Sequence, residues 1–227
     1  MSELWNIPPA CKVDSVIFKK LFYDNAELST ADKKLFTDVV SKITWFYSLK
    51  EENCFIHPYS DELREYPELE VISVQLHEKK AEKRIAEIIM RAIPYPMIIV
   101  MCCDEGQRLF VSHQRINQSD REKNVLEEMI FTEWISEEAT NGIIDFDKLK
   151  KSDFFMLYSD AVDAISVFNA GKISDDELTG EQARLLLQRQ QEKEAKVAGL
   201  RAQLKKETQF NRKMEISMEI KRLEGCK

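Results

Sequence analysis

The spacing of hydrophobic positions predicts a helix near the start of the chain. Ser29 is a suitable N-cap, and Asp32 follows three residues later in the first turn. Six apolar side chains then recur as on one face of a helix: Leu35, Phe36, Val39, Val40, Ile43 and Phe46. We therefore expect one helix from Ser29 through the segment KITWFYSL, followed by an irregular connector with a short strand at residues 54–57.

The middle of the chain changes between strand-like and helix-like patterns. Ile72, Val74 and Leu76 share one face of a strand, and the apolar side chains of residues 79–93 then follow a helical stripe. The run PMIIVMCC is typical of a buried central strand, and RLFVSH alternates after a turn at DEGQ. This order of strand, helix, strand, strand predicts a right-handed parallel crossover followed by an antiparallel hairpin.

The glycine of that turn sets the expected register of the hairpin. Gly106 supplies the positive φ that a tight turn requires. If the hairpin is centred there, the numbers of paired residues add up to about 211. Cys102 would then face Leu109, and Ser112 would face Ile99.

Two further helices are expected before the C-terminal region. Residues 121–138 carry one apolar stripe, and residues 152–170 carry another that ends at Gly171. The first stripe has five members: Val125, Leu126, Met129, Ile130 and Trp134. The predicted fold is therefore α+β, with a small mixed sheet packed by helices in a globular body of residues 1–172 and a linker at residues 173–180.

Residues 181–227 are predicted to form one long, coiled-coil-like helix. They contain no proline and are rich in strong helix formers. One seam follows alternate spacings of three and four: Val197, Leu200, Leu204, Asn211, Met214 and Met218. A second stripe starts at Ile216. Because a single helix cannot bury its own stripe, this helix either folds back on the body or forms an interface with a second copy or a partner protein.

The distribution of charge separates the body from the tail. Residues 181–227 contain twelve Lys and Arg against seven Asp and Glu, whereas the first 180 residues contain 21 against 33. An acidic body does not suit a broad nucleic-acid footprint, but the basic tail leaves nucleic-acid contact open. The chain has neither an apolar run long enough for a membrane nor a secretory signal pattern, so we expect a cytoplasmic protein without membrane contact.

Cys102, Cys103 and His113 are the residue types most suited to metal or nucleophilic chemistry. Adjacent strand residues point to opposite faces, so the two thiols cannot readily share one ion, and no second ligand pair follows. The expected register also keeps His113 away from the cysteines, which does not suit a Cys–His pair. The cysteines are five in number and scattered, which indicates reduced thiols. We expect no metal, no cofactor and no catalytic residue.

A metal-dependent nuclease is the enzymatic alternative. Acidic side chains flank the predicted strands at Glu70, Glu78, Asp104 and Glu105. Their spacing does not give an Asp on one strand and Glu-x-Lys on the next, as two-carboxylate metal chemistry would need. The glycine-rich loops that bind phosphate are also absent. The sequence therefore favours a binding protein over an enzyme.

The segment after the hairpin is the candidate contact surface. Four side chains there could bind phosphate or carboxylate groups: His113, Arg115, Asn117 and Arg121. The alternative is a solvated loop in which Ser119 caps the next helix.

Four segments resemble the bacterial Domain of Unknown Function 4391 family: KITWFYSL, IPYPMIIV, SHQRIN and LRAQLKKETQFNRKMEISMEIKRLE. The resemblance covers nearly the whole chain. It implies an accessory protein encoded beside helicase and methyltransferase components of restriction or phage-defence (antiviral) systems, and it carries over no catalytic residue. Similar members tend to have a Lys–Arg pair where this chain has Gln114 and Arg115, which weakens any role for position 114.

The expected function is that of a non-enzymatic accessory or adaptor subunit. It would act through protein–protein contacts of the C-terminal helix, either as a homo-oligomer or with a DNA-acting partner. The alternatives are a metal-dependent nuclease and a nucleic-acid-binding protein with a non-standard site.

Overall fold

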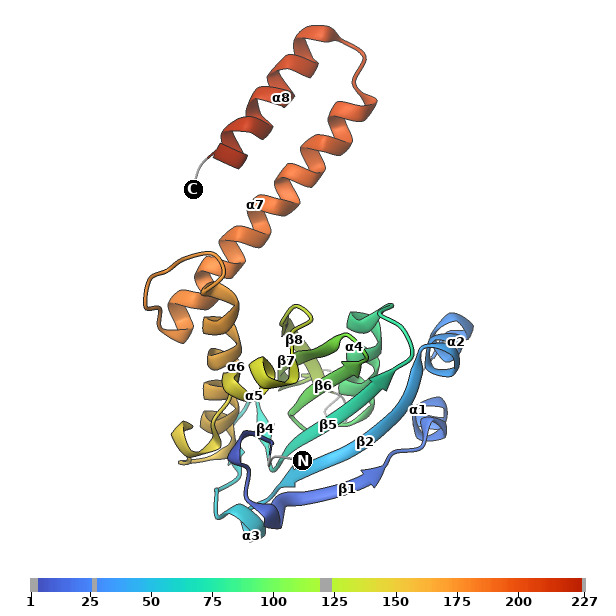
Figure 1. The fold of residues 1–227 in the computed structure, drawn as a ribbon, viewed down its shortest axis with the longest axis vertical. Coiled ribbons are helices and arrows are strands. Elements are labelled where there is room, and N and C mark those ends of the chain that lie inside the picture. Colours follow the sequence, from blue (N-terminus) through green and yellow to red (C-terminus); the bar gives the residue numbers. More distant parts are fainter. Residues whose placement is uncertain (1–3, 26–27, 119–123, 226–227) are drawn as a thin grey trace.

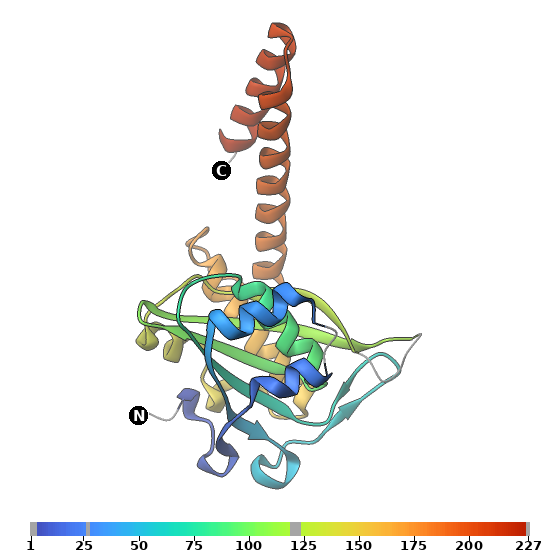
Figure 2. The ribbon, with the colours of Figure 1, turned by 90° about the vertical axis from the view of Figure 1, so that its right-hand side faces the viewer.

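The computed structural model describes residues 4–25, 28–118 and 124–225. A mixed β-sheet lies between two layers of helices, and two long C-terminal helices stand away from this body (Figures 1 and 2). This architecture confirms the predicted α+β fold. No helix among the described residues combines the length and the apolar content that crossing a membrane would need.

The main sheet has the strand order β1-β2-β5-β6-β7-β8 within the described residues. Its strands are β1 (Lys12–Val16), β2 (Val40–Leu49), β5 (Leu69–Leu76), β6 (Met97–Cys103), β7 (Gly106–Ile116) and β8 (Asn124–Phe131). Only β5 and β6 pair in parallel, and the other neighbours are antiparallel. A separate small hairpin consists of β3 (Tyr59–Ser60) and β4 (Glu65–Tyr66).

The helices divide between the two faces of the sheet and the C-terminal projection. They are α1 (Lys19–Asn25), α2 (Thr30–Asp38), α3 (Glu51–Cys54), α4 (Glu82–Ala92), α5 (Glu137–Ile143), α6 (Phe154–Ala170), α7 (Gly180–Lys206) and α8 (Phe210–Gly225). Short 3-10 turns occur at Leu4–Asn6, Pro9–Cys11 and Phe146–Lys148. The buried faces of α4 and α6 supply most of the core side chains that come from helices.

The sheet separates two hydrophobic cores. On one face, Ile98 and Val100 of β6 pack with α6, whose Tyr158 is completely buried. On the other face, Ile99 and Met101 of the same strand pack with α4. Because consecutive side chains of a strand point to opposite faces, the continuous apolar run of β6 follows from its central position.

The predicted strand-helix-strand-strand unit is confirmed as β5, α4, β6 and β7, but its hairpin register was wrong. Cys102 lies opposite Gln107, and Ile99 lies opposite Phe110. Only Asp104 and Glu105 form the turn, and Gly106 is already the first residue of β7. The pairing is therefore shifted by two residues from the one centred on Gly106.

The predicted helix from Ser29 to the KITWFYSL segment is correct only in its first half. Ser29 and Asp32 form the expected capping box, but α2 ends at Asp38 and Val40 begins a strand. The β-branched and aromatic residues of this segment suit a strand, and β2 pairs with both β1 and β5. Hydrogen bonds to the strands on both sides satisfy the backbone N–H and C=O groups of β2, which in the predicted helix would bond within the helix.

Three other predicted elements also differ from the structure. Residues 124–131 form β8 rather than part of a helix, because they pair with β7 at the edge of the sheet. Residues 51–54 form α3, so the short strand expected at 54–57 is absent; His57 makes an isolated bridge to Asp153 instead. The C-terminal helix breaks at Glu207, and α7 and α8 fold into a hairpin. The predicted helix at 152–170 is confirmed as α6.

Candidate functional site

The C-terminal helical hairpin is anchored to the body at the start of α7. Thr179 caps this helix through a capping box with Gln182, and Ala183 is completely buried. Arg184 forms an ion pair with Asp163 of α6. Beyond this contact with α6, α7 extends away from the sheet and α8 returns alongside it (Figure 2). The distal hairpin therefore projects from the body.

The two helices are held together by an apolar seam with ion pairs beside it. Ile220 of α8 is buried, and its neighbours Ile216 and Leu223 are half-buried. Lys196 pairs with Glu219 at 2.9 Å, and Arg201 pairs with Glu224 at 2.7 Å. The stripe that begins at Ile216 is therefore the one that α8 turns toward α7.

The six predicted interface residues fall into two groups. Val197, Leu200 and Leu204 of α7 are half-buried, whereas Asn211, Met214 and Met218 of α8 are exposed. Met214 and Met218 expose 49% and 66% of their surface, and Phe210, four residues earlier, exposes 74%. We call Phe210, Met214 and Met218 the outer stripe, because a spacing of four places them on one side of α8, outside the seam.

Positive charge is concentrated in the distal part of the hairpin. Residues 201–225 contain seven Lys and Arg against four Glu, whereas residues 180–200 contain four against three. Arg212 and Lys213 lie next to the outer stripe in the sequence and are exposed. The outer stripe is therefore an apolar surface in a basic setting.

His113 lies in an aromatic cluster rather than on a free surface. Its ring meets that of Tyr158 edge-on, with centroids 5.2 Å apart, and also contacts Tyr66 and Phe155. Its Nδ1 lies 2.9 Å from the Tyr66 hydroxyl. Burial, together with the positive charge of Arg64, lowers the pKa of His113 to about 4. The imidazole is consequently neutral near pH 7.

The other predicted contact residues differ from His113 in their burial and contacts where the structure describes them. Arg115 is exposed, and Asn117 is half-buried and already engaged in an interaction. Arg121 lies outside the described residues. Gln114 is buried and bonds the carbonyl oxygen of Tyr95 at 3.1 Å, which is a structural role.

The two adjacent cysteines lie in the wall of a polar cleft of about 610 Å³. Cys102 Sγ is 3.9 Å from the hydroxyl of Ser73, and burial raises the pKa of the Cys102 thiol. A protonated thiol is a poor nucleophile. His113 is seven residues along β7 from Gly106, or about 23 Å at the rise of a strand, so it cannot act on either cysteine.

Glu70 is kept apart from the turn acids considered for a nuclease, whereas Lys79, the neighbour of Glu78, pairs with Glu105 at 2.6 Å. Glu70 pairs in register with Met97 at the start of β6, whereas Asp104 follows the end of that strand, about 23 Å away. Glu78 lies 3.4 Å from Lys80. Among the described residues, no three His, Cys, Asp or Glu side chains form a group that could hold a metal ion.

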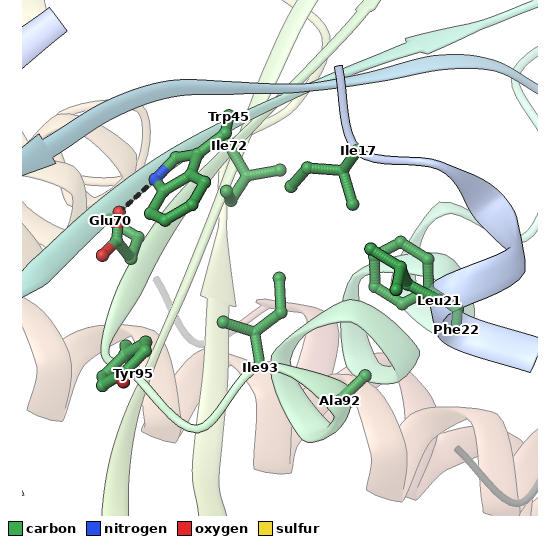
Figure 3. A pocket seen from close by; sticks show the side chains of 9 residues that line it. All are labelled: Ile17, Leu21, Phe22, Trp45, Glu70, Ile72, Ala92, Ile93 and Tyr95. Atoms are coloured by element: carbon green, nitrogen blue, oxygen red, sulfur yellow. Dashed lines mark hydrogen bonds between the residues drawn. The ribbon is translucent and has the colours of Figure 1, made fainter. Parts of the chain in front are cut away.

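A second cavity, of about 280 Å³, lies on the α4 side of the sheet (Figure 3). Its lining is almost entirely apolar: Ile17, Leu21, Phe22, Trp45, Glu70, Ile72, Ala92, Ile93 and Tyr95. Trp45, Glu70 and Tyr95 lie at one end, and Leu21, Phe22 and Ala92 lie at the other. One carboxyl group is thus the main polar feature of an apolar chamber.

Glu70 is only 1% exposed and is held by two hydrogen bonds. The Trp45 indole N–H donates to one carboxyl oxygen, and the Ser48 hydroxyl donates to the other over 3.1 Å. Burial raises the pKa of Glu70 to about 7, and the neighbouring Glu68 carboxyl adds to this shift. Lys50 pairs with Glu68 at 3.1 Å.

His113 and Glu70 should give the stability of the protein opposite dependences on pH. Between about pH 4 and 6.5 the unfolded chain protonates His113 and the folded chain does not, so stability rises with pH. Between about pH 4.5 and 7 the folded chain protonates Glu70 and the unfolded chain does not, so stability falls. Each effect amounts to about 3 kcal/mol.

Urea unfolding of two variants at several pH values would separate these effects. Glu70→Gln should leave a profile that rises between pH 4.5 and 6.5, and His113→Phe should leave one that falls. The two variants serve as controls for each other. Parallel profiles would show that neither group titrates as its environment indicates.

The fold and its surfaces define a class of protein: an α+β body that carries a projecting helical hairpin with an exposed apolar stripe. The chain belongs to the family described as Domain of unknown function (DUF4391), which matches residues 5–225. This match confirms the family resemblance. Comparisons with curated proteins and with solved structures find no match.

Sequence reasoning missed the residues of the Glu70 cavity. The predicted helix includes Trp45, whereas the structure places this residue opposite Ile72 on the neighbouring strand. The sequence indicates only a metal-ligand role for Glu70. The available signal was an acid within the strand LEVISVQL, because such a side chain must be buried and hydrogen-bonded if that strand is central.

Proposed function

We propose that this protein is a non-enzymatic accessory subunit that binds a partner protein through the outer stripe of its C-terminal hairpin. The observation that carries the proposal is the exposure of Phe210, Met214 and Met218 on a projecting helix. They lie outside the seam that stabilises the hairpin, so packing within the chain does not account for them.

The chemistry of the outer stripe suits an apolar groove on the partner. Side chains at positions i, i+4 and i+8 of a helix are typical anchors for helix-in-groove recognition. Methionine is flexible and polarizable, so it adapts to the shape of a groove. The basic residues around the stripe favour a groove with an acidic rim. Family resemblance supports a DNA-acting component of a defence system as that partner.

The double variant Met214→Glu/Met218→Glu should weaken partner binding at least about tenfold, because it places two carboxylates in an apolar and acid-rimmed contact. Both side chains are exposed, so circular dichroism should show unchanged helix content. A photo-crosslinking amino acid at Phe210 in the wild-type sequence would first identify the partner in cells. Binding to that purified partner would then be measured by calorimetry.

The matched control is Ala195→Glu/Ala202→Glu, which adds the same charge at exposed positions of α7. It should bind the partner as the wild type does. Equal loss in both double variants would indicate a general charge effect and contradict the proposal. A crosslink only to a second copy, together with a dimer mass by light scattering, would replace the partner protein with self-association.

A further inference from the structure

The Glu70 cavity has the composition of a small-molecule site. Ligand sites are concave and mostly apolar, with a few polar groups that fix orientation. Here a chamber of about 280 Å³ has Ile72, Ile93 and Phe22 in its wall and a carboxyl side chain at one end (Figure 3). Its position on the α4 face separates it from the outer stripe, so this inference is independent of the proposed function.

Exposed apolar side chains lie next to the cavity. Phe18 exposes 72% of its surface and Leu21 exposes 53%, and Leu21 also lines the cavity. Ile17, the neighbour of Phe18, is in the lining as well. An apolar surface continuous with an apolar chamber favours the entry of a hydrophobic molecule from this side.

Neither side chain that donates a hydrogen bond to the buried carboxyl group carries a positive charge. The donors to it, Trp45 and Ser48, are uncharged, and the neighbouring Glu68 side chain that also interacts with it is another carboxyl group. Lys50, a cation that interacts with it through charge, is paired with Glu68. A carboxylate has room for about four hydrogen bonds, so two donors leave acceptor capacity free.

We propose that this cavity binds a small apolar amine, with its hydrocarbon part in the chamber and its ammonium group against the Glu70 carboxylate. At the packing density of a protein interior, the volume holds about eleven non-hydrogen atoms of roughly 25 Å³ each. An arylalkylamine has this size. The amine supplies both the missing positive charge and hydrogen-bond donors.

Other ligand classes fit the cavity less well. A carboxylate ligand would meet Glu70, which repels a negative charge. A pure hydrocarbon would fill the chamber but would leave the acceptor capacity of Glu70 unused. The acidic body, with 21 Lys and Arg against 33 Asp and Glu in residues 1–180, also attracts cations.

The test uses three probes that share one phenylbutyl part: 4-phenylbutylamine, butylbenzene and 5-phenylpentanoate. Binding to the full chain at pH 8 would be followed through the indole N–H signal of Trp45 in NMR spectra, because this group bonds Glu70 directly. The amine should bind at least about tenfold more tightly than butylbenzene, since a hydrogen bond to a charged group is added. The carboxylate should bind most weakly.

Two variants locate the site. Glu70→Gln keeps an acceptor for Trp45 but removes the charge, so amine binding should fall at least about tenfold while butylbenzene binding stays the same. Ala92→Phe fills the chamber and should abolish binding of both probes. The amine should also bind more weakly at pH 5.5 than at pH 8, because burial and the neighbouring Glu68 raise the pKa of Glu70, which gains a proton in this range. Lys50, paired with Glu68, and Tyr95, in the cavity lining, are the other charged or titratable groups around it.

Three results would overturn the proposal. The first is the absence of any change in the Trp45 signal with millimolar amine. The second is equal affinity of the amine and the carboxylate for the wild-type protein, a comparison that does not depend on any variant folding. The third is unchanged amine binding in Glu70→Gln.

Discussion

Replacing Gly106 with alanine is expected to lower the free energy of unfolding by about 3 kcal/mol. Gly106 has φ +132°, a region that residues with a Cβ rarely adopt. A Cβ there would lie 2.3 Å from the carbonyl oxygen of Ile135. Ile135 cannot move away easily, because its backbone exchanges hydrogen bonds of 2.7 and 2.9 Å with Gln107.

Urea denaturation of Gly106→Ala would be compared with the same substitution at Gly199. Gly199 lies within α7, and a Cβ there would meet nothing within 4 Å. Gly199→Ala should therefore leave stability unchanged or raise it by up to about 1 kcal/mol. A small loss at Gly106, similar to the effect at Gly199, would mean that the turn and Ile135 adjust freely.

Replacing Tyr158 with phenylalanine is expected to cost about 2–3 kcal/mol, although only one oxygen atom is removed. The hydroxyl is completely buried and accepts the backbone N–H of Ser112 at 2.9 Å. Its hydrogen is shared between the carbonyl oxygens of Met97 and Ser112, at 2.9 and 3.0 Å. The variant leaves these buried groups of β6 and β7 without their partner.

The matched control is Tyr59→Phe, which also removes one hydroxyl. That hydroxyl bonds Asp61 at 2.8 Å in an exposed setting, so water can replace it. The ring can still stack on Phe155. The control should change the unfolding free energy by less than about 0.5 kcal/mol. Equal losses in both variants would contradict the central role of Tyr158 between α6 and the sheet.

Periodicity predicted elements correctly where one pattern was present and failed where two coexisted. The apolar residues of β5 fit only the spacing of a strand, and those of α4 fit only the spacing of a helix. Between Val39 and Leu49 the apolar residues satisfy a helical spacing. They also satisfy a strand-like alternation, in which Lys42 and Thr44 lie on the other face. The choice was made by strands β1 and β5, which lie far away in the sequence, so no local pattern could decide it.

The same limit explains β8 and the hairpin break. Met129 packs on the α4 side of the sheet and Ile130 on the α6 side, an arrangement that a helical stripe does not describe. The second stripe at Ile216 did indicate a change of register, but its meaning depended on α8 folding back on α7. That reversal occurs at Glu207 without proline or glycine to mark it.

Candidate sites were predicted less well than the fold, because residue type alone does not report burial. His113 was expected at a contact surface, but Tyr66 and Tyr158 enclose it. Glu70 lies among apolar neighbours contributed by β2, β5 and the end of α4. The crossover connection between β5 and β6 brings these neighbours close to Glu70. The sequence predicted the crossover but not which side chains it places around Glu70.

The attachment of α7 gives the hairpin a mechanical property. A helix of 27 residues is about 40 Å long, and its first turns are packed and ion-paired on α6. The direction of the hairpin is therefore set by a packed joint instead of a flexible tether. A molecule bound at the far end of the hairpin would be held at a fixed distance and angle from the body. Substitutions at Asp163 or Arg184 would therefore change the position of the bound molecule rather than its affinity.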